Sequence, residues 1–276
     1  MRISFNQWKS VATRAPHKPL LFLLALGQWQ QGHKSFTWTF AEPILTNLLN
    51  RFGRPAKKQT PENPWARLQA DDLWVLNPAP ILVNGNYSAK NLTNQNSEGS
   101  LSQSVQDWLI KHPEDLIRWT YEILDEQFPP SQHVDILNAC GISTYETAVK
   151  TKRKRNPGFA SDVLRNYGNR CAVCGYHLQI DHQTIGLEAA HIQWHAFEGP
   201  DTVDNGLALC SLHHKLFDYG AFGLSDDYSV LVSQKVNGNS VNDLAKFHGA
   251  QLLTHPIDFV NPKLEFIRWQ RNEVLK

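Results

Sequence analysis

The sequence predicts an α+β protein with a helix-rich mixed domain in its first half and a smaller, metal-stabilised domain in its second half. Three observations support this prediction. The chain has 276 residues, more than one domain usually contains, and 41% of them are hydrophobic. Apolar helical patterns fill the first half, whereas pairs of Cys and His residues at metal-ligand spacing occur in the second. A strongly basic run lies between the two halves.

The first half contains three helix patterns and one predicted hairpin. Apolar spacing, acidic first turns and terminal glycines predict helices over residues 17–32, 40–53 and 113–128. Apolar and polar residues alternate on both sides of Ala-Asp-Asp within residues 65–76, which predicts a hairpin. The first domain is therefore expected to be mixed, with helices dominating.

A basic segment separates the two predicted domains. Residues 150–155 contain five Lys or Arg residues, directly before Asn-Pro-Gly. We interpret residues 146–158 as a linker between domains over residues 1–145 and 159–276. A basic run is often only a solvated segment, but it can also follow a phosphate backbone, because neutralised phosphates release counterions. The run alone leaves both interpretations open.

Neither a membrane span nor a secretory signal is expected. The longest apolar run, residues 19–26, is far shorter than the ~20 residues that a membrane helix needs. The first ten residues lack an apolar stretch followed by a cleavage site. We therefore expect a cytoplasmic protein whose four cysteines are thiols, because the cytosol keeps thiols reduced.

The second half combines a short helix, two strand patterns and another helix with two pairs of metal-ligand residues. The helix begins at residue 159, the strands are expected over residues 187–192 and 228–233, and the second helix over residues 210–220. The cysteine and histidine pairs are Cys171 with Cys174 and Cys210 with His213. Zinc prefers four such ligands in a tetrahedron, so we predict a structural zinc site. The alternative is buried thiols with a surface histidine.

His214 and Asp218 form a further pair beside the predicted zinc site. Adjacent helical residues differ in direction by ~100°, so His214 faces away from His213. His214 and Asp218 are four residues apart and share a helix face. Such a pair can bind a harder divalent ion that keeps positions open for phosphate and water, or it can be a simple salt bridge.

The second half resembles the HNH endonucleases of the ββα-metal type. The resemblance is carried by His191, Asn205 and His214, interleaved with the two zinc pairs, and by the phrases "LEAAHI", "NGLALC" and "HHKLFDYG". These phrases are similar to the modification-dependent restriction branch of that family. The resemblance extends from residue 159 to about residue 235 and implies a DNA endonuclease with a ββα-metal fold.

The resemblance also implies roles for individual residues. His191 would be the general base that takes a proton from the attacking water, and His214 would bind a catalytic Mg or Mn ion with Asp218 as a co-ligand. Asn205 would orient the loop or the base, or join the metal shell.

One position departs from the family pattern. Many members have an acidic residue immediately before the base, where this chain has Ala190. Either Glu188 substitutes by reaching in from the same strand, or water fills the gap. The metal shell is therefore expected to differ from that of many members.

The first half resembles the sulfur-binding domain that precedes HNH modules in phosphorothioate-dependent restriction enzymes. The phrases "RAPHKPLLFLLALG", "LLNRFGRP", "PENPWARLQADDLWVL" and "SAKNL" carry this resemblance over residues 5–140. It implies a small pocket with an apolar floor for sulfur and a basic rim for DNA. The matching positions, all expected to contact DNA, are His17, Lys18, Asn63, Pro64, Trp65, Arg67 and Lys90.

Two of these positions depart from the family. Asn63 stands where an aromatic residue is usual, which makes the pocket more polar. Lys18 replaces an arginine and loses its bidentate geometry. His17 and Lys18 nevertheless lie at the start of the predicted helix, where a helix N-terminus and a cation can meet phosphate.

Together the two resemblances imply a restriction endonuclease that binds double-stranded DNA carrying a phosphorothioate and hydrolyses phosphodiester bonds. A homodimer is one way to cut both strands. Two alternatives stay open. The same nuclease can be directed to a modified base such as methylcytosine, with Trp65 and Trp74 stacking a flipped base. A DNA-binding protein with an inactive nuclease site is the other, and Ala190 keeps it open.

Overall fold

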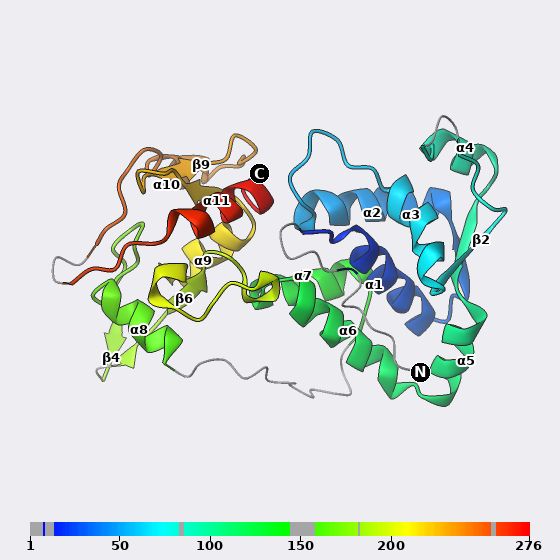
Figure 1. Ribbon diagram of the computed structural model, residues 1–276, viewed down its shortest axis with the longest axis horizontal. Helices are drawn as coiled ribbons and strands as arrows, with labels where there is room; N and C mark the ends of the chain where they lie inside the picture. Colours follow the sequence, from blue (N-terminus) through cyan, green and yellow to red (C-terminus); the bar gives the residue numbers. More distant parts are fainter. Residues whose placement is uncertain (1–7, 9–13, 83–85, 144–157, 182, 255–257) are drawn as a thin grey trace. The chain divides into compact units, whose positions relative to one another are not determined.

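The chain folds into two compact units, Met1–Thr151 and Lys152–Lys276, each of which mixes helices and strands (Figure 1). The computed structural model describes residues 8, 14–82, 86–143, 158–181, 183–254 and 258–276. The predicted α+β class is confirmed. The predicted basic linker, residues 146–158, lies outside the described residues except for Gly158.

Seven α-helices are present in the described part of the first unit, and all three predicted helices are among them. Their bounds are α1 His17–Gln30, α2 Trp38–Phe52, α3 Glu62–Arg67, α4 Ala89–Asn94, α5 Gln103–Lys111, α6 Glu114–Gln127 and α7 Pro130–Cys140. α1 is the central helix: every residue of 19–28 is buried, and α2, α3, α6 and α7 pack around it. A helix that is apolar on all sides is stable only when it is surrounded in this way.

The first unit also has a small antiparallel sheet with strand order β1-β3-β2. The strands are β1 Ser35–Thr37, β2 Trp74–Asn77 and β3 Glu98–Leu101. Gly99 is required in β3, because a Cβ atom there would lie 2.1 Å from the Trp74 ring.

The hairpin predicted over residues 65–76 is wrong. α3 continues into a 3₁₀ helix, η2 Leu68–Asp71, and only β2 is extended. Trp65 and Leu68 are buried at a spacing of three, which suits a helix, and Asp72 ends it with φ = 58°. Such a short stretch fits both the helical and the alternating pattern, so its periodicity did not distinguish them.

Four aromatic rings form the centre of the packing between this sheet and its helices. Trp65 lies 5.2 Å from Trp74, 5.5 Å from Trp38 and 5.6 Å from Phe36, measured between ring centroids. The Trp65 side chain is fully buried, and its Nε1 donates a hydrogen bond of 3.1 Å to Ser97 Oγ. Edge-to-face contacts of this kind add to the free energy gained by burial.

The second unit is organised around the paired strands β6 and β7 followed by helix α9. β6 and β7 pair antiparallel, with Leu187 opposite Cys210 and His191 opposite Gly206. α8 packs against both strands, and β8 packs against α9. The bounds are α8 Phe159–Asn166, β4 Gln179–Ile180, β5 Gln183–Thr184, β6 Leu187–His191, η3 His195–Phe197, η4 Val203–Asn205, β7 Gly206–Cys210, α9 Ser211–Asp218, β8 Phe222–Leu224, β9 Val230–Val232, α10 Val241–Ala245 and α11 Leu264–Glu273.

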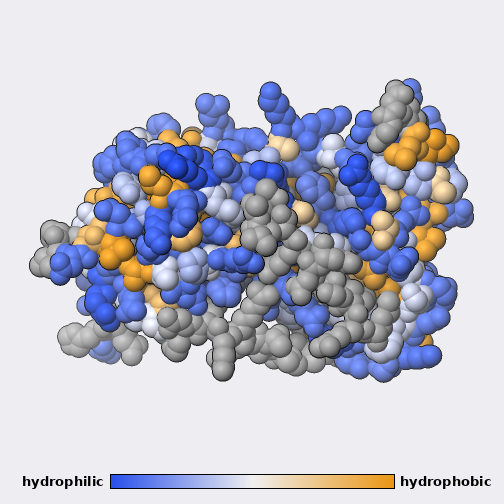
Figure 2. Space-filling model, viewed as in Figure 1, coloured by the Kyte–Doolittle hydropathy of each residue, from blue (hydrophilic) through white to orange (hydrophobic). Residues whose placement is uncertain are grey.

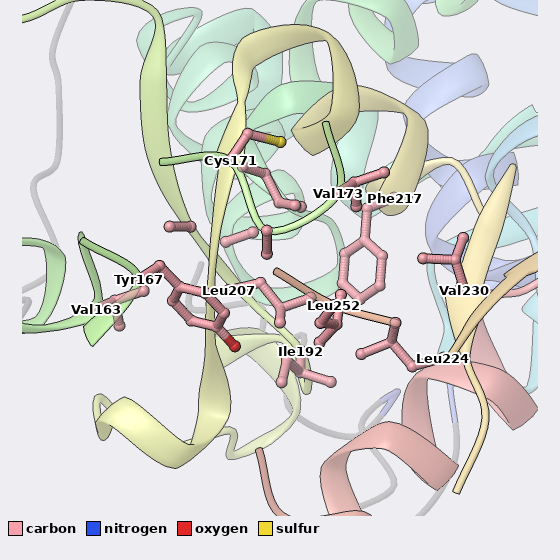
Figure 3. Close-up of a cluster of buried hydrophobic side chains, with 14 of the residues drawn as sticks. Val163, Tyr167, Cys171, Val173, Ile192, Leu207, Phe217, Leu224, Val230 and Leu252 are labelled. Carbon is pink, nitrogen blue, oxygen red and sulfur yellow. The ribbon is translucent and has the colours of Figure 1, made fainter. Parts of the chain in front are cut away.

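An apolar core fixes the second unit from inside. Figure 3 shows Ile192, Leu207 and Phe217 pointing into the same cluster from three different segments, with Cys171 at its edge. All four side chains are buried. Because Cys171 and α9 share this core, the turn that carries the cysteines and the helix that carries the histidines are held in a fixed relation.

Within the described residues, none of the helices combines the length and apolar character needed to cross a membrane. Figure 2 shows hydrophilic residues over most of the visible face of both units, with smaller hydrophobic patches between them.

The aromatic centre of the first unit gives a testable prediction. Trp65→Ala removes a fully buried ring and its hydrogen bond, so we expect the unfolding free energy of the first unit to fall by about 3–5 kcal/mol. Hydrogen exchange read by mass spectrometry would locate the loss in this unit. Lys90→Ala, at an exposed position, serves as the control, and equal stability of the two variants would contradict the assignment of Trp65 to the core.

Candidate functional site

The four predicted zinc ligands come together in the second unit. Cys171 and Cys174 follow α8, Cys210 ends β7 and His213 lies in the first turn of α9. Their ligand atoms all lie within 4.8 Å of one another, so they form a group that can hold a metal ion. The Sγ atoms of Cys174 and Cys210 are 4.0 Å apart. This matches the edge of about 3.8 Å in a tetrahedron with Zn–S bonds of about 2.3 Å.

Hydrogen bonding within this group stabilises one thiolate. Burial raises the pKa of the Cys171 thiol, but the hydrogen bond with His213 Nδ1 at 3.6 Å and nearby backbone N–H groups outweigh it and bring the pKa to about 6. Burial raises the pKa of Cys174 to about 12. A metal ion binds the three cysteines as thiolates. The protein alone stabilises the thiolate of Cys171 but not that of Cys174, so the positive charge of the metal ion would have to stabilise the latter.

His191, the predicted base, lies at the end of β6 and is held on two sides. Its Nε2 atom lies 2.8 Å from Oδ1 of Asp201. The ring of Phe159 stacks on the imidazole at 4.1 Å between centroids and 19° between planes. A third ring, His195, meets it edge-on at 6.0 Å. Asp201 and Phe159 are not among the residues predicted from the sequence, although the acidic character of Asp201, in the loop before Asn205, was a signal that could have identified it.

Asn205 is fully buried, and its side-chain amide forms hydrogen bonds with backbone groups. Its Oδ1 accepts from the N–H of Gln193 at 2.9 Å, and its Nδ2 donates to the carbonyls of Gln193 and Pro200, each at 3.0 Å. The amide therefore ties both ends of the loop that follows β6. Of the three roles left open by the sequence, this geometry favours the one that orients the loop.

His214 lies between two carboxylates. Its Nδ1 is 2.6 Å from Oε2 of Glu188, and its Nε2 is 3.4 Å from Oδ2 of Asp218. A single ion binds only one ring nitrogen, so Glu188 and Asp218 do not converge with His214 on one point. Asp218 is buried, whereas the Glu188 side chain is 48% exposed. The solvent-accessible carboxylate is thus the one at Nδ1.

Glu188 has the surroundings of an ionised ligand. Burial raises the pKa of its carboxyl, but hydrogen bonds from Ser211 and His214 outweigh this effect and hold the pKa below its usual value. Ala190, in contrast, is fully buried in the apolar core of the second unit. An acidic side chain at position 190 would face that core, and the acid of this strand is instead at 188.

In the first unit, the predicted DNA contacts fall on three helices. His17 and Lys18 begin α1, while Asn63 and Arg67 lie on α3, which packs against α1. Arg67 is exposed and Asn63 is half-buried. Lys90 is also exposed, but it lies on α4, which packs against α2.

The surroundings of Lys18 and His17 determine the charge that each of them presents. Lys18 Nζ bonds both carboxylate oxygens of Asp71, at 2.7 and 3.0 Å, and Trp8 Nε1 donates to the same carboxylate at 2.9 Å. Burial, assisted by the nearby positive charge of Arg14, lowers the pKa of His17. His17 is therefore neutral near pH 7, so that among the predicted DNA contacts on α1 and α3 the positively charged ones are Lys18 and Arg67.

Trp65 requires a correction. It was expected to contact DNA, but its side chain is fully buried and cannot reach a ligand at the surface. Trp74, considered with it for stacking a flipped base, is 2% exposed. Pro64 is buried as well, a position that suits the floor of a pocket rather than its rim. The sequence pattern could not distinguish these roles because core and pocket residues are both apolar.

The β6-β7-α9 arrangement, its Cys and His group and the placement of His191, Asn205 and His214 define a DNA endonuclease domain of the HNH class. Residues 171–225 match the family model of HNH endonucleases. Residues 3–145, more than half of the chain, match the ScoMcrA-like DNA sulfur-binding domain. The chain therefore belongs to the ScoMcrA-like DNA sulfur-binding family, and it combines this domain with an HNH endonuclease domain.

Solved structures with detectable similarity include domains of the same kind. The sulfur-binding domain of ScoMcrA complexed with phosphorothioated DNA is 19% identical, with a TM-score of 0.43, over 50% of this chain and 96% of that chain. The modification-dependent TagI restriction endonuclease is 26% identical, with a TM-score of 0.36, over 50% of this chain and 43% of its own. The comparison with curated proteins gives no match.

The cysteine and histidine group predicts measurable metal content. We expect protein purified without chelator to contain a single zinc ion per chain, and Cys171→Ala to lose it and to lower the melting temperature of the second unit. Cys140→Ala, which removes a buried thiol of the first unit, is the matched control and should retain the metal. Zinc retained in Cys171→Ala, measured by plasma mass spectrometry, would refute the site.

Asn205 gives a second prediction that separates a loop-orienting role from a metal-binding one. Asn205→Ala leaves buried backbone groups without partners, at about 1–3 kcal/mol each. Asn205→Asp keeps the acceptor and loses both donors, so both variants should speed hydrogen exchange in residues 193–205 and reduce DNA cutting. A metal ligand would tolerate Asp, so full cutting by Asn205→Asp would argue against the loop-orienting role.

Proposed function

We propose that this protein is a restriction endonuclease that binds double-stranded DNA through a backbone phosphorothioate and hydrolyses phosphodiester bonds with its HNH domain. The observation that carries the proposal is the presence of both domains in one chain, a ScoMcrA-like sulfur-binding domain over residues 3–145 and an HNH endonuclease over residues 171–225. A domain that selects modified DNA and a domain that cuts DNA together have the chemistry of modification-dependent restriction.

The surface made by the first turn of α1 and by α3 is the proposed DNA-binding site. A phosphorothioate sulfur is larger and less strongly hydrated than oxygen, so contact with an apolar floor near Pro64 favours it, while cations hold the anionic backbone. His17 is neutral and offers a hydrogen-bond donor without adding charge. Arg67 supplies an exposed guanidinium, which binds phosphate well because of its planar set of donors.

Lys18 contributes to the same surface through its pair with Asp71. Its ammonium has three donors, and two bonds go to the carboxylate. The third N–H remains for a phosphate oxygen. The carboxylate fixes the position of the ammonium and also lowers the net positive charge, which reduces attraction to unmodified DNA.

In the HNH domain, His191 is the proposed general base. It takes a proton from water as the water oxygen bonds to phosphorus, and the leaving oxygen departs with the electron pair of the P–O bond. Asn205 holds the loop that follows the base. The structural role of Cys171, Cys174, Cys210 and His213 is to hold zinc and so to fix the start of α9.

Glu188 and His214 are the proposed ligands of the catalytic divalent ion. Their atoms are 2.6 Å apart, close to the separation of about 3 Å between neighbouring ligands at the octahedral distances of Mg. Asp218, at the other ring nitrogen, would orient the imidazole, as carboxylates commonly do for metal-binding histidines. When bound, Mg or Mn supplies positive charge to the phosphate and the leaving oxygen. A pair of chains, each with one such site, is the proposed arrangement for cutting both strands.

The proposed function predicts a specific pattern of binding and cutting. With matched duplexes that are unmodified, phosphorothioated or methylated, and with Mg or Mn present, we expect retention and cutting of the phosphorothioated duplex alone. His191→Ala should abolish cutting and leave retention unchanged. Retention without cutting under every metal would refute the nuclease function, and indifference to sulfur would refute the proposed substrate.

The DNA-binding surface can be tested separately from cutting. Lys18→Ala and Arg67→Ala should each weaken retention of the phosphorothioated duplex and lower the slope of log K against log salt by about one, because each removes one phosphate contact. Lys111→Ala, which removes an exposed charge at the end of α5, is the charge-matched control. Unchanged affinity and slope in both test variants would show that the DNA contacts lie elsewhere.

A further inference from the structure

The carboxylate of Asp201, which is not one of the three residues that define the HNH motif here, contacts His191, the proposed base. Asp201 lies in the loop between η3 and η4, and its Oδ1 is 2.8 Å from Nε2 of His191. Both side chains are only 15% exposed, so solvent screens the contact weakly. Phe159 stacks on the imidazole face. The stack fixes the plane of the ring, and the carboxylate fixes its rotation within that plane.

The chemistry of this contact assigns the proton on the ring. An ionised carboxylate can only accept a hydrogen bond, so Nε2 of His191 must carry the hydrogen. In the neutral imidazole the lone pair is then on Nδ1. We propose that Asp201 is a positioning residue for DNA hydrolysis: it keeps His191 as the Nε2–H tautomer and directs proton abstraction to Nδ1. This proposal rests on the proposed nuclease function.

The same contact stabilises the state that follows proton abstraction. Once Nδ1 has taken the proton from water, the ring is an imidazolium, and the Asp201 carboxylate then forms a charge-assisted hydrogen bond with it. A buried carboxylate beside a catalytic histidine acts in this way in hydrolases that use a Ser-His-Asp triad. Asp201 itself gains no proton in this scheme.

The fold fixes Asp201 as firmly as it fixes His191. Asn205 Nδ2 donates to the carbonyl of Pro200, the residue directly before Asp201. The carbonyl of Asn205 accepts from the N–H of Ile192, the residue directly after His191. One buried asparagine therefore links the backbone next to the base with the backbone next to its carboxylate. An incidental surface salt bridge would not have this support.

The decisive variant is Asp201→Asn in the full chain, compared with Asp204→Asn. Asp204 lies three residues later, in η4, and its carboxylate pairs with Lys263 at 3.0 Å and not with His191. We expect Asp201→Asn to reduce kcat for the phosphorothioated duplex by about 10²–10⁴-fold, the range of general-base catalysis, with KM and retention within about twofold of the wild type. Asp204→Asn should cut at the wild-type rate, and Asp201→Glu, which keeps an ionised acceptor, should recover part of the loss.

The tautomer itself provides a readout that does not depend on cutting. In full-length protein labelled with ¹⁵N-histidine, and with His191→Gln to assign the signals, wild-type His191 should show the proton on Nε2. Asp201→Asn should shift it toward Nδ1, because the Asn amide can donate to Nε2. A wild-type Nδ1–H tautomer, an unchanged rate in Asp201→Asn, or an equal loss in Asp204→Asn would each overturn the proposal.

Failure of the proposed function would be distinguishable from failure of this inference. A wild-type protein that binds but cuts no duplex would overturn the nuclease function, whereas the tautomer would still report whether Asp201 holds the ring. If Asp201→Asn does not fold, the wild-type tautomer and the rate of Asp201→Glu decide the matter. A Nε2–H ring with partial activity in Asp201→Glu supports the positioning role.

Discussion

The antiparallel pairing of β6 with β7 is the constraint on which the chemistry of the second unit depends. It places Cys210 opposite Leu187 at one end and Gly206 opposite His191 at the other. Five residues of strand separate these ends by about 13 Å, at about 3.3 Å per residue. The two strands therefore keep the cysteine and histidine group apart from His191. A shift of one residue in the register of the pair would turn the His191 side chain to the opposite face of the sheet.

α9 follows directly from this pairing and places its two adjacent histidines in two different groups near the Cys210 end. It begins directly after Cys210, so its first turn brings His213 to within 3.1 Å of the Cys210 sulfur. The next residue, His214, points in another direction and meets Glu188 on the neighbouring strand. The adjacent histidines therefore belong to two different groups because a helix turns about 100° per residue, and the contact of His213 with the cysteines fixes the position from which His214 projects.

Features that depend on local spacing were predictable from the sequence, and features that depend on distant packing were not. The cysteine pairs and the helices α1, α2, α6 and α9 follow from spacing alone. The hairpin prediction around Trp65 fails because the helical form of this stretch depends on burial against Trp38, which lies 27 residues earlier in the sequence. Asp201 was missed for the same kind of reason, because an irregular loop carries no periodic pattern that would place its side chain beside His191.

A common principle explains how His191 and His214 can have different proposed roles despite identical chemistry. A histidine has two ring nitrogens, and the partner of one determines what the other can do. Asp201 takes Nε2 of His191, which leaves the lone pair on Nδ1 for a proton. Asp218 contacts Nε2 of His214, so that Nδ1 meets Glu188 on the side where the metal ion is proposed to bind. The carboxylates around the site, more than the histidines themselves, thus distinguish the proposed base from the proposed metal ligand. The strand has no acid at position 190, which is buried, and Glu188 is the carboxylate of this strand that contacts His214.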